Sequence, residues 1–138
     1  MDIYRRRIMD GMLAKKLQSK GAVLIEGPKW CGKTTTAEEI AASKVMLART
    51  DVKEHFKSLL EIDMDAALSG DTPMLIDEWQ TVPKLWDAVR YTIDSRRKMG
   101  QFILTGSAVP DKDGEKEIKH SGAGRFAWLM MRPMTLFE

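Results

Sequence analysis

The 138-residue sequence has few of the side chains that bind zinc or form disulfides, since it contains one cysteine and two histidines. A single cysteine cannot form a disulfide within the chain, and this supply is too small for a four-ligand zinc site of cysteine and histidine. A lone cysteine is typical of proteins from a reducing compartment. The predicted location is therefore the cytoplasm.

A strong excess of one charge and a long apolar run are also missing. Lysine and arginine number 22 against 20 aspartates and glutamates, a net charge of +2, so composition alone does not indicate a nucleic-acid-binding protein. No apolar run approaches the roughly 18 residues that span a bilayer, and the basic N-terminus is not followed by the apolar stretch of a signal peptide. We expect neither a membrane protein nor a secreted one.

The chain does have enough apolar residues for one core. It is 43% hydrophobic and 30% charged, and this composition at this length is typical of one compact domain rather than two. No internal repeat or domain boundary is evident. Residues 1–138 are therefore predicted to form a single domain.

Strand-like and helix-like segments alternate along the sequence. Five short apolar runs have the length of buried strands, at residues 22–26, 45–48, 73–77, 101–106 and 126–131. Helices are predicted at 4–20, 33–43, 51–69 and about 82–93, and a polar loop at 109–124. This alternation predicts a three-layer α/β fold with a mostly parallel five-stranded sheet.

Two of these helices carry more detailed expectations. In the basic N-terminal segment at 4–20, Asp10 is a candidate N-cap. The apolar side of this segment is expected to hold Ile8, Met12, Leu13 and Leu17. The last helix should have Pro83 in its first turn. Its buried side should hold Val82, Leu85, Trp86, Val89 and Ile93, and Trp79 and Trp86 are expected in the core or at an interface.

The segment from Gly27 to Thr34 matches the pattern G-x-x-x-x-G-K-[ST] and lies between a predicted strand and a predicted helix. Its glycines let successive backbone N–H groups face one concavity, and the helix N-terminus adds a positive dipole end, so both favour polyphosphate. We expect Lys33 to reach the β and γ phosphates and Thr34 to offer a hydroxyl to Mg²⁺. The candidate nucleotide-binding residues are Gly27, Pro28, Lys29, Trp30, Cys31, Gly32, Lys33, Thr34 and Thr35.

A pair of acids ends the third predicted strand. Asp77 should emerge beside the phosphate loop, because ligands of parallel sheets bind at the carboxyl ends of the strands, and there it can hold Mg²⁺. Glu78 is placed to orient and deprotonate an attacking water and is the predicted catalytic base. An acidic strand end packed against basic neighbours is the structural alternative.

Three further residues are candidates for the reaction. Thr105 and Ser107 follow the fourth predicted strand and could place a hydroxyl near the γ-phosphate or the attacking water, or could only stabilise a turn at Gly106. Arg125 precedes the last predicted strand. It could present its guanidinium to the transferring phosphate from the same chain or from a neighbouring subunit, or it could be an ordinary surface arginine.

Basic residues gather near the N-terminus, and they could contact nucleic acid, an acidic partner or only solvent. They are Arg5, Arg6, Arg7, Lys15, Lys16 and Lys20. Since the net charge is small, solvent is the favoured interpretation.

In this order the motifs resemble the N-terminal AAA-type domain of prokaryotic ATPases usually called ATP-binding proteins. The matching segments are residues 27–34, 76–78, 101–107 and 120–125, together with the opening residues 4–8 and the closing residues 131–138. The resemblance implies an additional-strand P-loop ATPase with a catalytic glutamate. It also implies a C-terminal domain of unknown function, so that Glu138 would be a boundary within a longer protein.

We therefore predict a domain that binds Mg-ATP and hydrolyses it to ADP and phosphate, coupled to a conformational change in the attached C-terminal domain. A homo-oligomer would allow Arg125 to act between subunits. Two alternatives stay open: a nucleotide switch without hydrolysis, and a nucleic-acid-directed motor or loader. A small-molecule kinase and a GTPase fit less well, because neither an arginine-rich lid nor an N-K-x-D element is found.

Overall fold

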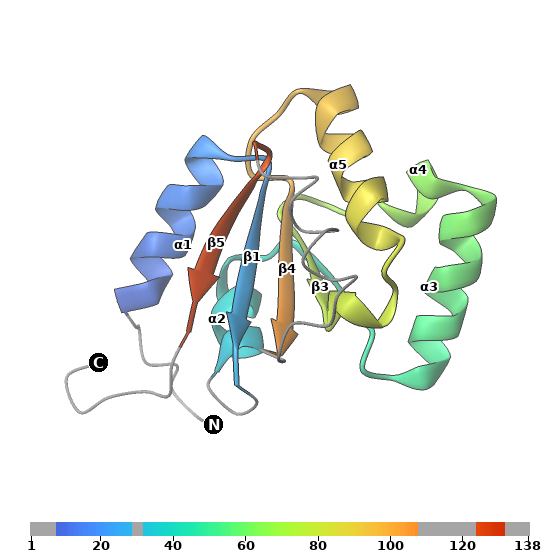
Figure 1. The fold of residues 1–138 in the computed structure, drawn as a ribbon, viewed down its shortest axis with the longest axis horizontal. Helices are drawn as coiled ribbons and strands as arrows, with labels where there is room; N and C mark the ends of the chain where they lie inside the picture. The colour runs from blue at the N-terminus through green and yellow to red at the C-terminus, as the bar shows by residue number, and fades with distance from the viewer. Residues whose placement is uncertain (1–7, 29–31, 108–123, 132–138) are drawn as a thin grey trace.

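The computed structural model describes residues 8–28, 32–107 and 124–131 (Figure 1). Five strands form one sheet in the order β2-β3-β4-β1-β5, and every pairing between neighbours is parallel. The strands are β1 (Ala22–Gly27), β2 (Ser43–Met46), β3 (Met74–Asp77), β4 (Phe102–Ser107) and β5 (Phe126–Met130). The predicted α/β class and the parallel five-stranded sheet are confirmed, and β4 is an additional strand between β1 and β3.

Helices cover both faces of this sheet, which gives three layers (Figure 1). The helices are α1 (Ile8–Ser19), α2 (Lys33–Ile40), α3 (Thr50–Ile62), α4 (Met64–Ala67) and α5 (Leu85–Arg96), with a 3-10 turn η1 (Trp79–Thr81). Helices α1 and α2 lie on one side of the sheet, and α3, α4 and α5 lie on the other. None of the helices within the described ranges is both long and apolar enough to cross a bilayer.

The apolar side chains of the strands belong to two separate hydrophobic clusters, one on each face of the sheet, because consecutive residues of a strand point to opposite faces. One cluster packs under α1 and α2 and contains Val23, Ile25, Leu75, Ile103, Leu13, Leu17 and Ala37, among others. The other packs under α3 and α5 and contains Leu24, Ile76, Leu104, Phe56, Leu60, Trp86 and Val89, among others. The continuous apolar runs of β1, β3 and β4 thus belong to strands that are buried on both faces, whereas the edge strands β2 and β5 are partly exposed.

Aromatic side chains link the α5 layer to the edge strand β5. The rings of Trp86 and Phe126 stack with centroids 3.9 Å apart, and Trp79 lies 5.0 Å from Trp86. Trp79 and Trp86 are both buried, as expected for core residues. The five apolar residues predicted for the buried side of the last helical segment, from Val82 to Ile93, are buried as well.

Several predicted boundaries are wrong. Helix α2 ends at Ile40, and β2 begins at Ser43, two residues earlier than predicted. The single helix predicted at 51–69 is two helices, because the Asp63 side chain accepts a 3.1 Å hydrogen bond from the Ala66 N–H and so caps α4. Pro83 lies before α5, which starts at Leu85.

The N-terminal helix also differs from the prediction. Helix α1 already contains Ile8, so Asp10 lies within its first turn and is not its N-cap. Leu13 and Leu17 are buried as predicted, whereas Met12 is 43% exposed. Most of the loop predicted at 109–124 lies outside the described residues, as do Arg5, Arg6 and Arg7.

Candidate functional site

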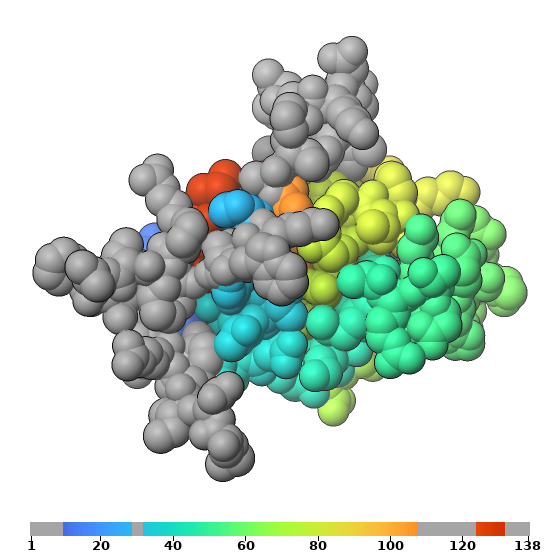
Figure 2. Space-filling view, turned by 90° about the horizontal axis from the view of Figure 1, so that it is seen from below, coloured from blue at the N-terminus to red at the C-terminus, as the bar shows by residue number. Residues whose placement is uncertain are grey.

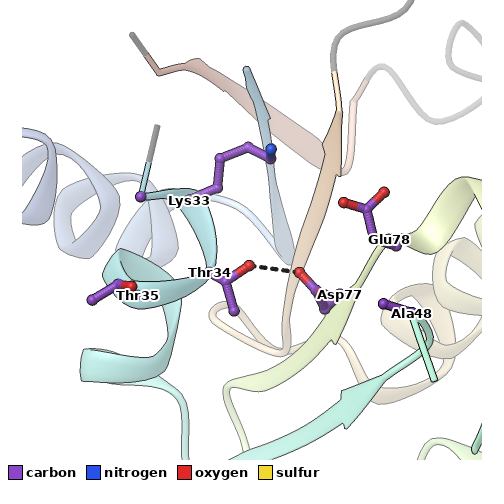
Figure 3. A pocket seen from close by; sticks show the side chains of 7 residues that line it. Lys33, Thr34, Thr35, Ala48, Asp77 and Glu78 are labelled. Carbon is purple, nitrogen blue, oxygen red and sulfur yellow. Dashed lines mark hydrogen bonds between the residues drawn. The ribbon is translucent and has the colours of Figure 1, made fainter. Parts of the chain in front are cut away.

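A pocket of about 560 Å³ opens at the carboxyl ends of the strands, and Figure 2 views the molecule from this end. Three segments supply its walls: the start of α2, the end of β3 with the residue that follows it, and the turn after β2. The described lining residues are Gly32, Lys33, Thr34, Thr35, Ala48, Asp77 and Glu78 (Figure 3). Five of the residues predicted for a nucleotide site or its Mg²⁺ therefore meet in one cavity, together with the predicted base Glu78.

The first turn of α2, which follows the predicted phosphate loop, forms one side of the pocket. Gly32 has φ of +92°, a backbone conformation that glycine adopts without steric penalty. Lys33 is 6% exposed, and its ammonium donates a 3.3 Å hydrogen bond to the backbone oxygen of Pro28. The cation is thus held close to the end of β1. Lys29, Trp30 and Cys31 lie outside the described residues.

Asp77 receives two hydroxyl donors on a single oxygen. Thr34, in the first turn of α2, donates to Asp77 Oδ1 at 2.8 Å, and Thr105 of β4 donates to the same atom at 2.6 Å. Asp77 and Thr105 are aligned in the β3–β4 register, so their side chains lie on the same face of the sheet, the one that α2 covers. This alignment explains why a residue of helix α2 and a residue of strand β4 meet at one carboxylate.

Glu78 leaves the extended conformation of β3. Consecutive residues of a strand point to opposite faces, so an extended Glu78 would face the α5 layer. Its backbone instead adopts φ of 57° and ψ of 49°, in the left-handed region. For a residue with a side chain this conformation costs about 1–2 kcal/mol. Such strain is concentrated at functional sites, and here it directs the carboxylate into the pocket (Figure 3).

Both carboxylate oxygens of Glu78 accept hydrogen bonds. Gln80 Nε2 donates to Oε2 at 2.6 Å, and Ser107 Oγ donates to Oε1 at 3.3 Å. The Glu78 backbone oxygen accepts from the N–H and the hydroxyl of Thr81, at 3.2 and 2.9 Å. The turn η1 therefore anchors the backbone of Glu78, while Gln80 and Ser107 orient its side chain.

The two hydroxyls predicted near the phosphate occupy different positions. Ser107 is half-buried and donates to Glu78, whereas Thr105 is fully buried and donates to Asp77. Neither hydroxyl belongs to the described residues that line the pocket. The Thr105 hydroxyl therefore orients the Asp77 carboxylate from the neighbouring strand β4.

Arg125 lies at the opposite end of the sheet from the pocket. Its backbone oxygen accepts from Ala22 N–H at 3.2 Å, at the start of β1. Its guanidinium makes a bidentate ion pair with Asp94 of α5, at 2.9 and 3.1 Å. This hydrogen-bonded pair lowers the pKa of Asp94 and raises the pKa of Arg125. The structure therefore does not bring Arg125 to the pocket of its own chain.

The pocket's oxygen donors are of the kind that Mg²⁺ prefers. Thr34 and Asp77 offer a hydroxyl and a carboxylate within 2.8 Å of each other, and Mg²⁺ is usually held by one or two such groups together with phosphate oxygens and water. Within the described residues no three histidine, cysteine or acidic side chains cluster as metal ligands. The donor set fits Mg²⁺ bound together with a polyphosphate.

Sequence reasoning missed two residues of the site. Ala48 lines the pocket because β2 runs parallel to β3, and Leu47 N–H donates to the Asp77 backbone oxygen at 3.2 Å. Knowledge of the strand order, with β2 beside β3, would have identified Ala48 as a pocket residue. Gln80 holds Glu78, but a glutamine in a turn carries no sequence signal that separates this role from simple exposure.

Comparisons with known proteins agree with this architecture. A family model described as an AAA domain matches residues 19–138. An uncharacterized protein of Mycobacterium tuberculosis and one of Mycobacterium bovis are each 30% identical to this chain over 135 residues. The match covers 97% of this chain but 30% of each relative, so the chain spans less than a third of the length of these curated relatives.

Proposed function

The chain belongs to the AAA domain family, and from this premise we propose that its pocket binds Mg-ATP and that Glu78 directs hydrolysis to ADP and phosphate. Membership of the family indicates nucleotide binding. The choice of ATP, the role of Mg²⁺ and the hydrolytic step are the proposal.

One observation carries it: a buried lysine, a hydroxyl–carboxylate pair and a strained glutamate converge on one pocket. Lys33 is the cation, Thr34 and Asp77 are the oxygen donors, and Glu78 is the second acid. They come from two elements far apart in sequence, and each has a role that phosphoryl transfer to water requires.

The chain's own residues divide the chemistry between them. Lys33 and the N–H groups at the start of α2 would hold the phosphates and offset their negative charge. Thr34 and Asp77 would hold Mg²⁺, which supplies further neutralisation of phosphate charge when bound. Glu78 would accept a proton from the attacking water at its carboxylate, while Gln80 and Ser107 limit the rotation of that carboxylate.

Two parts of the proposal concern the protein beyond these residues. We propose that hydrolysis drives a conformational change in the C-terminal part of a longer polypeptide, since the curated relatives extend well beyond the matched region.

Because Arg125 lies at the opposite end of the sheet from the pocket, it could reach a phosphate only in a neighbouring subunit, after its ion pair with Asp94 is broken.

The test is phosphate release from Mg-ATP by the wild-type chain and by Glu78→Gln, at several protein concentrations. We expect Glu78→Gln to bind ATP as tightly as wild type and to release phosphate at least about 100-fold more slowly, the usual contribution of a general base. Glu54→Gln, the same substitution at an exposed site on α3, is the matched control. A specific activity that rises with concentration would indicate completion by a second subunit. ATP binding with no turnover under any of these conditions would favour the nucleotide switch instead.

A further inference from the structure

The contact between Gln80 and Glu78 is the shortest hydrogen bond described to the Glu78 carboxylate. Gln80 Nε2 lies 2.6 Å from Oε2, compared with 3.3 Å between Ser107 Oγ and Oε1. Each carboxylate oxygen can accept two hydrogen bonds. A strong donor on Oε2 and a weak one on Oε1 leave Oε1 as the atom better able to accept another proton.

Gln80 makes this contact at an energetic disadvantage. Its Oε1 atom is buried, and no described residue donates a hydrogen bond to it. A buried acceptor without a donor is destabilising, so an apolar side chain of similar size would be the more stable choice if only packing mattered. What the amide contributes at this position is its donor end, which faces Glu78.

Gly106 of strand β4 leaves the space that the Gln80 side chain occupies. A Cβ at Gly106 would lie 2.9 Å from Gln80 Oε1 and 3.1 Å from Trp79 Nε1, closer than side chains normally approach. Gly106 lies between Thr105 and Ser107, the residues that donate to the two acids. Strand β4 thus supplies one hydroxyl donor to each acid and the space that Gln80 needs.

We propose that Gln80 is a positioning residue for hydrolysis: its amide fixes Oε2 of Glu78 so that Oε1 faces the attacking water. This inference rests on the proposed function, because it assigns a role in the same reaction. Gln80 itself touches neither nucleotide nor water in this scheme. Its effect on turnover should therefore depend entirely on the presence of the Glu78 carboxylate.

The test compares Gln80→Leu with Gln18→Leu, the same substitution at an exposed site on α1. Leucine keeps the approximate size of the side chain and removes the donor. We expect Gln80→Leu to lower kcat for ATP about ten-fold or more, since small misplacements of a catalytic group have effects of this size. Its affinity for ATP should stay within about two-fold of wild type, because no pocket contact with nucleotide is removed.

The double variant Glu78→Gln/Gln80→Leu separates positioning from a general structural effect. If Gln80 acts only through the carboxylate, the loss caused by Gln80→Leu should disappear once that carboxylate is gone. A further ten-fold fall in the double variant would overturn the proposal, as would an unchanged kcat in Gln80→Leu. The proposed function is judged separately, from wild type against Glu78→Gln, so the two can fail independently.

A second variant tests the same contact without removing the donor, and a structure of the first variant tests the orientation of Glu78 directly. Gly106→Ala should displace the Gln80 side chain and reduce kcat in the same direction, with ATP affinity retained. A crystal structure of Gln80→Leu should show the Glu78 carboxylate rotated away from its position here. The same Glu78 orientation in that structure, or full turnover in Gly106→Ala, would count against a positioning role.

Discussion

Thr34 donates a 2.8 Å hydrogen bond to Asp77 across 43 positions of sequence, and this contact joins the start of α2 to the end of β3. Both oxygens lie at the pocket and suit Mg²⁺. We expect Thr34→Val, which removes the hydroxyl but keeps the shape, to abolish most of the gain in ATP affinity produced by Mg²⁺, about ten-fold for one lost ligand. Calorimetric titration with ATP, in Mg²⁺ and in a chelator, measures that gain.

Thr34→Ser is the control for this prediction, because it restores a hydroxyl at the same place. Its Mg²⁺-dependent gain should approach that of wild type. An equal gain in Thr34→Val would show that the Thr34 hydroxyl does not contribute to the Mg²⁺ site.

Lys33 offers a test of phosphate recognition that is separate from the metal. Lys33→Met keeps the length of the side chain and removes the charge, so we expect ATP affinity to fall about 10- to 100-fold, the range for a lost charged hydrogen bond. The folded state should not lose stability, since the variant no longer buries an ammonium that is 6% exposed. ATP titration and urea unfolding check the two parts, and Lys44→Met, on the exposed surface of β2, is the control.

Thr105 should matter for stability as well as for activity. Its hydroxyl is buried and donates to Asp77 at 2.6 Å. Thr105→Val removes one of the two donors to this carboxylate, and we expect the free energy of unfolding to fall by about 1–3 kcal/mol. Urea denaturation measures the change. The double variant Thr105→Val/Asp77→Asn should lose less than the sum of the two single variants, and strict additivity would contradict a direct role of this bond.

The ion pair of Arg125 and Asp94 predicts a pH-dependent contribution to stability. Its lowered pKa means that Asp94 stays charged in the folded state at a pH where it becomes protonated in the unfolded state. The pair therefore stabilises fully above the ordinary aspartate range and loses its effect as the pH falls through the lowered pKa. We expect Asp94→Asn to be less stable than wild type at neutral pH, with the difference disappearing in acid. Because both residues are exposed, high salt should shrink the difference too. A difference that does not change with pH would contradict this assignment.

The sequence predicted the strands with two buried faces well, because their pattern is local and strong. It was weaker at β2, an edge strand with Ser43 and Lys44, where the boundary is set by pairing with β3 rather than by apolar residues. The break at Asp63 was also missed. An aspartate inside an amphipathic repeat has the same local sequence pattern whether it caps a new helix or only faces solvent.

The candidate site shows a similar division. The phosphate-loop pattern predicted that Gly32, Lys33 and Thr34 would lie at one site, and all three line the pocket. The prediction was possible because the pattern encodes a local backbone shape. Contacts between elements were harder to predict. The sequence could not show that Thr105 is buried against Asp77 whereas the half-buried Ser107 contacts Glu78. Nor could it place Arg125 beside Asp94, since that contact depends on how α5 packs beside the start of β5.

The left-handed backbone at Glu78 determines the environment of its charge. In an extended strand this carboxylate would enter the layer of Trp79 and Trp86, where an unpaired anion costs several kcal/mol. The observed conformation costs about 1–2 kcal/mol. One rotation of the backbone therefore moves the anion from a hydrocarbon-like medium of low dielectric constant to a cavity open to water, and it is the less costly of the two ways to keep an acid next to Asp77.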